Sequence, residues 1–170
     1  MGTAAIGLGA NLGDRLAALQ GAIDSLERVP GVHVIAVSGV YETDPVGGPE
    51  QGDFLNAVAV VALDTSPTDL LAACQAIESE WHRTRDVRWG PRTLDVDILS
   101  IDDLVSDDPA LTLPHPRAAV RAFVCIPWLE ADPEAHIPEV GAVRDIVSTL
   151  DADGVRPRAD LSLRLPERTP

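Results

Sequence analysis

Apolar residues follow two different spacings along the chain, and each spacing predicts a kind of secondary structure. Residues 15–28 carry apolar side chains three or four positions apart, which is the spacing of one face of an α-helix. Ser66 and Pro67 open a second such segment, with the serine as its N-cap. Short apolar or alternating runs predict strands. Together the patterns predict strands over 4–8, 32–41, 54–63 and 94–101 and helices over 15–28 and 66–82.

The order of these elements, strand-helix-strand-strand-helix-strand, is that of the ferredoxin-like β-α-β-β-α-β arrangement. We therefore expect an α+β fold in which two helices pack on one face of an antiparallel sheet. A C-terminal extension follows. It is predicted to contain a tight turn at 102–103, a strand and loop over 111–116, helix over most of 117–130 and a short helix over 143–150.

The chain end, residues 151–170, has a weaker pattern. It holds three prolines and mixed charges, and only Leu161, Leu163 and Leu165 alternate with polar residues. An edge strand and a disordered tail are both compatible with this pattern. We therefore expect one domain over 1–150, followed by this tail.

The composition is that of an ordinary soluble globular protein, with 45% apolar and 24% charged residues among 170. No apolar run approaches the roughly 20 residues of a transmembrane helix. The first residues lack the basic segment of a secretory signal. Cys74 and Cys125 stand in apolar surroundings without metal-type spacing, which favours reduced core residues over a disulfide. These features predict a cytoplasmic protein.

The charged residues are unusual, because the net charge is −14 and all 13 basic residues are arginine. Without lysine there is no P-loop, Schiff-base or protein-kinase lysine, so phosphate binding must depend on arginine, backbone amides and metal. Residues 83–92 hold four arginines and one aspartate, a local charge of +3. A basic island this small fits a small anionic ligand better than a nucleic acid, which would meet a wider basic surface.

Asp95 and Asp97 stand two positions apart in the predicted strand 94–101. Side chains alternate faces along a strand, so both carboxylates share one face, roughly 7 Å apart, and their apolar neighbours share the other. Such a pair could simply be the solvated face of a half-exposed strand. The arginine island and the turn at 89–91 bring guanidinium groups to the same strand end. They favour a site where hard cations bridge phosphate oxygens.

Other candidate residues have structural explanations that compete with functional ones. Gln75 and Glu78 share one side of the second predicted helix, which is either an exposed face or a neighbour of the arginine island. His115 stands between two prolines, so a rigid surface loop or a phosphate contact is favoured over a core position. Three aromatic residues either pack in the core or bind a ligand: Phe54, Trp89 and Phe123.

A glycine pattern near the N-terminus approaches a dinucleotide-binding fingerprint. Gly7, Gly9 and Gly13 stand in the stretch G-L-G-A-N-L-G, which misses the spacing G-x-G-x-x-G by one position. A tight strand-to-helix turn, with Asn11 or Asp14 as the helix cap, explains the glycines better. The fingerprint is therefore a weak signal.

Five motifs stand in order along the chain. They are G-x-N-L-G-D over 9–14, Y-E-T-D-P-V-G over 41–47, F-L-N over 54–56, R-W-G-P-R-T-L-D-V-D-I over 88–98 and L-P-H-P-R-A-A-V-R-A-F over 113–123. In this order they resemble the 6-hydroxymethyl-7,8-dihydropterin pyrophosphokinases, enzymes of the folate pathway. The resemblance covers about residues 3–150. An eleven-residue signature with four supporting motifs makes coincidence improbable.

The resemblance implies that ATP, as co-substrate, donates its β,γ-diphosphate to the hydroxymethyl group of the pterin. It implies two Mg²⁺ ions held by Asp95 and Asp97, and it gives Arg83 and Arg92 the transferring phosphates. These four residues are the expected catalytic set. The resemblance also implies ATP contacts at Gln75, Glu78, Arg83, Arg85, Arg88, Trp89, Arg92, Ile98, Thr112, His115 and Arg121.

For the pterin, the resemblance implies an aromatic sandwich between Phe54 and Phe123 and an amide contact from Asn56. A flat bicyclic ring gains from stacking, and an amide offers both a donor and an acceptor to its polar edge. The full expected pterin set is Thr43, Asp44, Pro45, Val46, Phe54, Asn56, Trp89 and Phe123.

Two other functions remain as alternatives. A non-catalytic nucleotide or divalent-metal-binding module on the same fold would keep the arginines and carboxylates and lose the pterin residues. An RNA-binding module would need a basic face, which the net charge of −14 opposes. We therefore expect an enzyme whose partners are small-molecule substrates, with no nucleic acid or membrane partner, acting as a monomer.

Overall fold

A computed structural model describes residues 2–44, 53–83 and 94–167 of the chain. Its helices are α1 (Arg15–Arg28), α2 (Pro67–Arg83), the 3-10 helix η1 (Ala118–Val120), α3 (Ala122–Ala131) and α4 (Val143–Val147). Its strands are β1 (Gly2–Ala10), β2 (Val32–Val37), β3 (Tyr41–Thr43), β4 (Phe54–Leu63), β5 (Leu94–Ile101), β6 (Ser106–Asp108), β7 (Leu111–Leu113), β8 (His136–Ile137), β9 (Gly141–Ala142) and β10 (Val155–Pro157).

The centre of the protein is a sheet of six strands. Its order is β10-β3-β4-β1-β5, and β2 pairs with the other end of β4. Every pairing in this sheet is antiparallel, and Ile6 in the middle of β1 faces Ala59 of β4 on one side and Ile98 of β5 on the other. The expected antiparallel sheet with packed helices is therefore confirmed.

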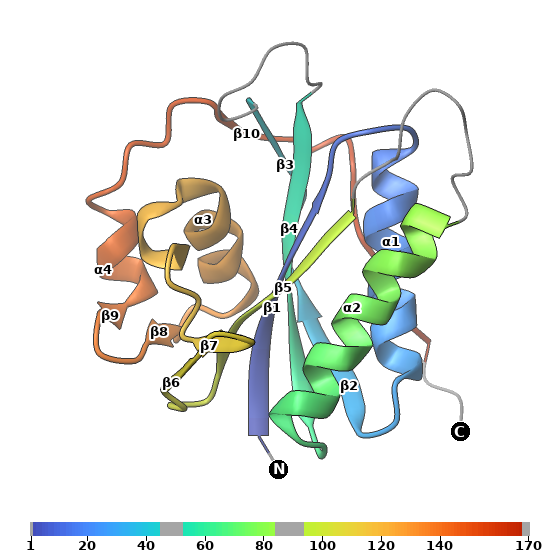
Figure 1. The fold of residues 1–170 in the computed structure, drawn as a ribbon. Coiled ribbons are helices and arrows are strands. Elements are labelled where there is room, and N and C mark those ends of the chain that lie inside the picture. Colours follow the sequence, from blue (N-terminus) through green and yellow to red (C-terminus); the bar gives the residue numbers. More distant parts are fainter. Residues whose placement is uncertain (1, 45–52, 84–93, 168–170) are drawn as a thin grey trace.

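Helices α1 and α2 cover one face of the sheet (Figure 1). The apolar positions of α1 that the sequence spaced three or four residues apart are buried there, together with alternate residues of β1, β4 and β5. Asp14 caps α1 by accepting a hydrogen bond from the Ala17 N–H (3.0 Å), and the Ser66 hydroxyl accepts one from the Asp69 N–H (3.1 Å). Both caps satisfy helix N–H groups that have no partner within the helix.

The two expected helices share one face, and the helices of the C-terminal extension, α3 and α4, pack on the opposite face (Figure 1). The physical reason lies in the sheet itself. On this face Ala5, Val58 and Leu99 form an apolar area at one end, and the buried Trp128 of α3 covers it. The other end of the same face carries polar residues and glycines, and it remains open. The C-terminal third of the chain thus completes a second core.

The single strand expected over 32–41 is two strands. β2 and β3 both run along β4, but Ser38–Val40 interrupts them. The Ser38 hydroxyl accepts a hydrogen bond from the Val58 N–H (2.9 Å), so a side chain replaces a strand partner at this point. Short hydroxyl side chains compete with the backbone in this way.

The remaining expectations are confirmed in outline. The turn at Asp102 and Asp103, the strand at β7 and a helical segment after Arg117 are present, although Arg121 divides that segment into η1 and α3. Cys74 and Cys125 are both buried and free. In the described ranges no helix is both long and apolar enough to span a membrane.

The described part of the tail is ordered and contains an edge strand. That strand is β10, which lies before the alternating leucines and pairs with β3. Leu161 and Leu163 instead pack against the core beneath α1. The side-chain amide of Gln20 on α1 also exchanges two hydrogen bonds with the backbone of Arg164 (3.0 and 2.9 Å).

Candidate active site

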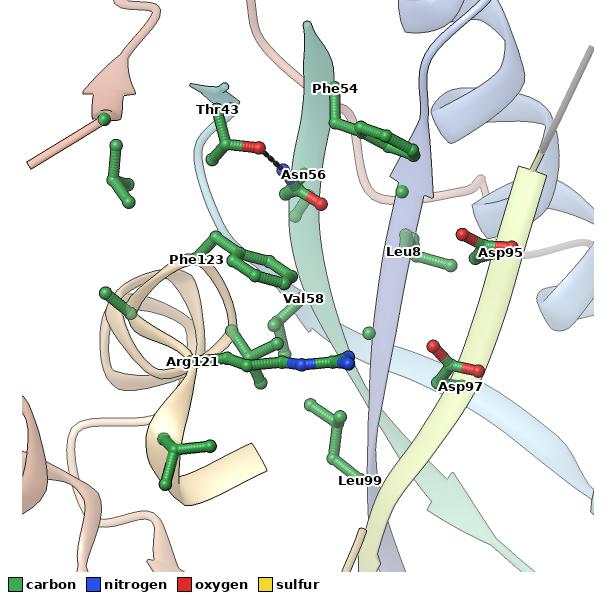
Figure 2. Close-up of a pocket in the computed structure, with 18 of the residues that line it drawn as sticks. Leu8, Thr43, Phe54, Asn56, Val58, Asp95, Asp97, Leu99, Arg121 and Phe123 are labelled. Carbon is green, nitrogen blue, oxygen red and sulfur yellow. Dashed lines mark hydrogen bonds between the residues drawn. The ribbon is translucent and has the colours of Figure 1, made fainter. Parts of the chain in front are cut away.

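A cavity of about 630 Å³ occupies the open end of the second sheet face (Figure 2). Its floor is formed by β1, β4 and β5, and its walls are the start of α3 and the segment 151–155. Ligand pockets commonly have volumes of roughly 300–1,000 Å³. The cavity is therefore large enough for a small-molecule site.

The carboxylates of Asp95 and Asp97 project from β5 into this cavity (Figure 2). Both residues are exposed, whereas Leu94, Val96 and Ile98 between and beside them are buried, as the alternation predicted. Placing an acidic pair on the floor of a cavity leaves both groups open to a cationic ligand or to a ligand that brings cations.

Two glycines of β1 keep the floor clear beside these carboxylates. Gly9 is the register partner of Asp95, and Gly7 is that of Asp97. A Cβ atom on Gly9 would lie 3.1 Å from the Asn56 Oδ1, so a side chain here would crowd the cavity. Gly13, with φ of 69°, instead forms the turn into α1. Gly13 is therefore a turn residue, as the sequence predicted, whereas Gly7 and Gly9 belong to the cavity floor, which the sequence did not predict.

Glu78 of α2 reaches the outer edge of β5 and accepts a hydrogen bond from the Val96 N–H (3.1 Å). Burial raises the pKa of Glu78; the negative charges of Asp97 and Asp95 add to this, and the hydrogen bond opposes it. The carboxylate therefore fixes the backbone between the two aspartates. It does not line the cavity.

Arg121 lies across the cavity from Asp97, and His115 lines the cavity beside β5, where its backbone N–H donates to the Leu99 carbonyl oxygen (2.9 Å). In Figure 2 the Arg121 guanidinium is directed toward β5. Burial lowers the pKa of His115; the charges of Arg121 and Arg117 lower it further, and Asp97 opposes them. The His115 Nδ1 accepts a hydrogen bond from the Arg117 N–H (3.2 Å). In the neutral ring Nε2 must then carry the proton, so it can donate to an anion.

The upper part of the cavity combines aromatic rings with one amide. Phe54, Phe123 and the Asn56 side chain are directed into the same space (Figure 2). The Asn56 Nδ2 donates to the Thr43 hydroxyl (2.8 Å), and both residues are buried. This bond orients the amide and leaves Oδ1 and one N–H for a ligand. The Arg121 guanidinium lies 5.5 Å from the centre of the Phe123 ring, within cation–π range.

The structure does not bring every expected site residue to this cavity. Ile98 is buried in the core beneath α1 and α2, so its side chain faces away from Asp97. Thr112 is exposed, and its hydroxyl donates to the Asp108 carbonyl oxygen (3.1 Å). Gln75 is exposed on α2 and is not among the lining residues.

Several expected residues lie outside the described part of the chain. Arg83 is described only as the last residue of α2, without its side chain. The others are Pro45, Val46, Arg85, Arg88, Trp89 and Arg92. Their contribution remains an expectation from the sequence.

The cavity also includes residues that the sequence reading missed. Asp151, Asp153, Gly154 and Val155 of the tail form one wall, and Val120 lines the cavity although it is 73% exposed. The Asp-Gly pair at 153–154 is a turn signal that marks a bend in the tail. Nothing in the linear pattern placed that bend against the sheet.

The donors on the cavity floor fit Mg²⁺. In the described part of the chain no cluster of three or more His, Cys, Asp or Glu side chains is arranged to hold a metal ion. Magnesium usually binds through one or two carboxylates and completes its octahedral shell with water and substrate phosphates. Asp95 and Asp97, exposed on one strand face, provide that protein share of the ligands.

Fold and cavity together define a class: an α+β protein whose antiparallel sheet presents an acidic pair, an arginine and an aromatic pocket in one cavity. Residues 5–133 match the model of the 7,8-dihydro-6-hydroxymethylpterin-pyrophosphokinase family. The chain belongs to this family.

Named relatives agree. A 2-amino-4-hydroxy-6-hydroxymethyldihydropteridine pyrophosphokinase of Pseudomonas aeruginosa is 39% identical over 150 residues, covering 88% of this chain and 93% of the relative. One of the same name from Mycobacterium tuberculosis H37Rv is 41% identical over 180 aligned residues, covering 95% and 94%.

Solved structures support the fold. The chain resembles a Plasmodium falciparum HPPK-DHPS crystal structure with a TM-score of 0.69 at 14% identity, covering 86% of this chain and 45% of the other. The chain therefore spans less than half of the length of that solved protein.

Proposed function

We propose that this chain is an ATP-dependent pyrophosphokinase of folate biosynthesis. It transfers diphosphate from ATP to the hydroxymethyl group of 6-hydroxymethyl-7,8-dihydropterin and releases AMP and the pterin diphosphate. Membership of the family and the names of its relatives support this activity. The observation that carries it is one cavity with an acidic pair on its floor and an aromatic and amide pocket directly above.

In the proposed reaction the hydroxyl oxygen of the pterin attacks the β-phosphorus of ATP. A new oxygen–phosphorus bond forms, the bond between the β-phosphorus and the oxygen bridging to the α-phosphate breaks, and the hydroxyl proton leaves to solvent. Catalysis of such a transfer depends mainly on positioning and on neutralising charge. When bound, Mg²⁺ would neutralise the phosphate oxygens and hold them in position.

We assign the phosphate end of the cavity to ATP. Asp95 and Asp97 would hold two Mg²⁺ ions, and the Arg121 guanidinium and the His115 Nε2–H would contact phosphate oxygens. The exposed position of the two carboxylates and the direction of Arg121 support this assignment. Glu78 would act through the backbone of β5. The other ATP contacts that we propose are Arg83, Arg85, Arg88, Trp89 and Arg92. Gln75, Ile98 and Thr112 lie outside the cavity lining, so they would contact only a part of ATP that extends beyond the cavity.

We assign the upper part of the cavity to the pterin. Phe54 and Phe123 would stack on the ring, and the Asn56 amide, oriented by Thr43, would bind its polar edge. The buried hydrogen bond between Asn56 and Thr43 supports this, because it fixes the amide before any ligand arrives. The further pterin contacts that we propose are Asp44, Pro45, Val46 and Trp89.

Finer statements about the whole protein also remain proposals. The strand order, with the first strand between the third and the last of the four expected strands, supports a ferredoxin-like sheet over 1–150. A monomer in the cytoplasm is the expected state, which size-exclusion chromatography and cell fractionation would test. A non-catalytic nucleotide- or metal-binding module is less consistent with the cavity, since such a module has no need of the oriented Asn56 amide and the two phenylalanines.

One assay tests the activity and the acidic pair together: AMP formation from ATP, Mg²⁺ and hydroxymethyl-dihydropterin. Asp95→Ala and Asp97→Ala should each lower the rate by roughly a hundredfold or more, because each removes a charge-stabilising group from the transition state. Asp145→Ala, an exposed aspartate on α4, is the matched control and should keep the wild-type rate. No AMP from the wild-type protein would refute the activity, and wild-type rates in both cavity variants would refute the metal assignment.

A further inference from the structure

The tail strand β10 lies beside the proposed pterin pocket. It pairs with β3, so that Val155 faces Thr43 and Arg156 faces Glu42, and β3 in turn places Thr43 opposite Phe54 of β4. The segment before β10 forms a wall of the cavity. The edge strand β10 is therefore separated from β4, which carries Phe54, by β3 alone.

Arg156 joins the two chain segments that carry the pterin-side residues. Its Nη1 donates to the Asp44 Oδ1 (2.9 Å), and its Nη2 donates to the Asp53 Oδ2 (3.0 Å). Asp44 follows Thr43 at the end of β3, and Asp53 precedes Phe54 at the start of β4. One guanidinium thus joins residues 44 and 53, which flank the paired Thr43 and Phe54 where β3 ends and β4 begins.

We propose that Arg156 is a positioning residue for the pterin side of the cavity. By joining Asp44 to Asp53 it holds Thr43 and Phe54 at a fixed separation, and through Thr43 it holds the Asn56 amide. The inference rests on the proposed pterin assignment. A planar guanidinium with two parallel donors suits this task better than a lysine, which has a single charged centre.

The tail is shaped for a close approach to Asp44. Gly154 has a φ of 83°, a conformation that residues with a Cβ rarely adopt, and its carbonyl oxygen accepts a hydrogen bond from the Asp44 N–H (3.2 Å). A Cβ on Gly154 would also lie only 3.1 Å from the Asp44 Oδ2. Backbone and side-chain contacts therefore hold the same residue, and both come from the tail.

Arg156 lies among three carboxylates, so its loss would change the positions of the residues that carry them. Asp44, Asp53 and Glu42 all lie within 4 Å of its guanidinium, with Glu42 at 3.9 Å. Arg15 donates to the Glu42 carboxylate and to the Asp53 carbonyl oxygen, both at 2.8 Å, so these contacts do not replace the one that Arg156 makes with the Asp44 carboxylate. Without Arg156 the Asp44 and Asp53 carboxylates would repel each other and separate the two strand ends.

The same ion pairs are too exposed to matter greatly for folding. The side chains of Arg156, Asp44 and Asp53 are 45%, 63% and 39% exposed. Exposed pairs contribute little to stability and are screened by salt. The expected consequence of losing Arg156 is therefore a displaced pocket wall in a folded protein.

Steady-state kinetics of Arg156→Ala test the proposal. The KM for the pterin should rise by roughly five- to tenfold, with kcat and the KM for ATP changed by less than about twofold, because only ground-state positioning of the pterin is lost. Arg158→Ala is the matched control: it removes the same charge two residues later, where the guanidinium contacts Asp160 and Glu42. It should leave the KM for the pterin within about twofold of wild type.

A double variant and a salt series separate positioning from general damage. Adding Asp53→Asn to Arg156→Ala should lower the pterin KM part of the way back toward wild type, since the neutral amide removes the repulsion between residues 44 and 53. Raising NaCl should increase the pterin KM of the wild type and lower that of Arg156→Ala, because salt screens both the ion pairs of Arg156 and the repulsion left without it. An unchanged pterin KM in an active Arg156→Ala protein, or equal increases in both KM values, would overturn the inference. An inactive wild type would instead overturn the proposed function.

Discussion

Phe123 tests the pterin pocket at the level of one side chain. It stands at the start of α3, half-buried, with its ring directed into the cavity (Figure 2). Phe123→Ala should weaken pterin binding by roughly tenfold and ATP binding by much less, because a stacked aromatic contact adds about 1 kcal/mol beyond the area it buries. Titration calorimetry with each substrate measures the two affinities directly.

A neighbouring residue provides the control for Phe123. Ile126 lies on the same helix, is also half-buried and does not line the cavity. Ile126→Ala should therefore reduce stability without a selective effect on the pterin. If Phe123→Ala weakened both substrates equally, the ring would not be acting as a stacking surface.

Individual residues differ in how far the sequence could predict them. Asp95 and Asp97 were placed correctly because a period of two along an apolar strand fixes which side chains share a face. Gly7 and Gly9 were not recognised as floor residues, because their role depends on Asn56 and Leu99 of other strands. Local alternation carries the first kind of information, and strand register carries the second.

At the level of single elements, the ion pairs of β3 centre on the Glu42 carboxylate, which faces Arg15, Arg156 and Arg158. The hydrogen bond from Arg15 lowers the pKa of Glu42, burial opposes this, and the charges of Arg158 and Arg156 lower it further. A carboxyl group whose folded-state pKa is lowered stabilises the fold fully above its unfolded pKa of about 4.3. That stabilisation is lost as the pH falls through the folded-state pKa.

The replacement Glu42→Gln should therefore lower stability at neutral pH and make little difference in acid. The melting temperature of the wild type should exceed that of Glu42→Gln at pH 7, and the gap should close as the pH falls below the unfolded pKa of about 4.3 and through the lowered folded-state pKa. Thermal unfolding followed by circular dichroism at several pH values measures the gap. A constant gap across this range would mean that the ion pairs of Glu42 do not support the fold.

Elements with strong local signals were predictable, and those that depend on distant partners were not. The helix expected over 15–28 is α1, and the strands expected over 54–63 and 94–101 are β4 and β5. These segments combine helical or strand periodicity with clear caps or turns. β10 has three residues and no periodicity, and it is a strand because β3 offers it an edge. The sequence could not supply that partner.

At the level of the whole molecule, the C-terminal third has two separate tasks. Helices α3 and α4 close the apolar end of the second sheet face, and the tail continues past the cavity to the opposite side of the sheet. There Leu161 and Leu163 pack beneath α1, and Gln20 bonds to the backbone of Arg164. The tail thus connects the pocket wall to the first core.

A truncation after Arg158 separates the two tasks of the tail. It removes Leu161 and Leu163 from the core but keeps β10 and Arg156. Partial burial of two leucines is worth about 2 kcal/mol, so the melting temperature should fall by roughly 4–8 °C. The KM for the pterin should stay near the wild-type value, because the pocket wall remains.

Comparing the truncation with Arg156→Ala tests whether the pocket wall and the packing beneath α1 are independent. The point variant should change the pterin KM with little change in melting temperature, and the truncation should do the reverse. The two effects should be independent, since the contacts of Arg156 and those of Leu161 share no partner in the described part of the chain. If the truncation raised the pterin KM as much as Arg156→Ala does, the packing beneath α1 and the pocket wall would be one cooperative unit, and Arg156 would transmit that packing to the pocket.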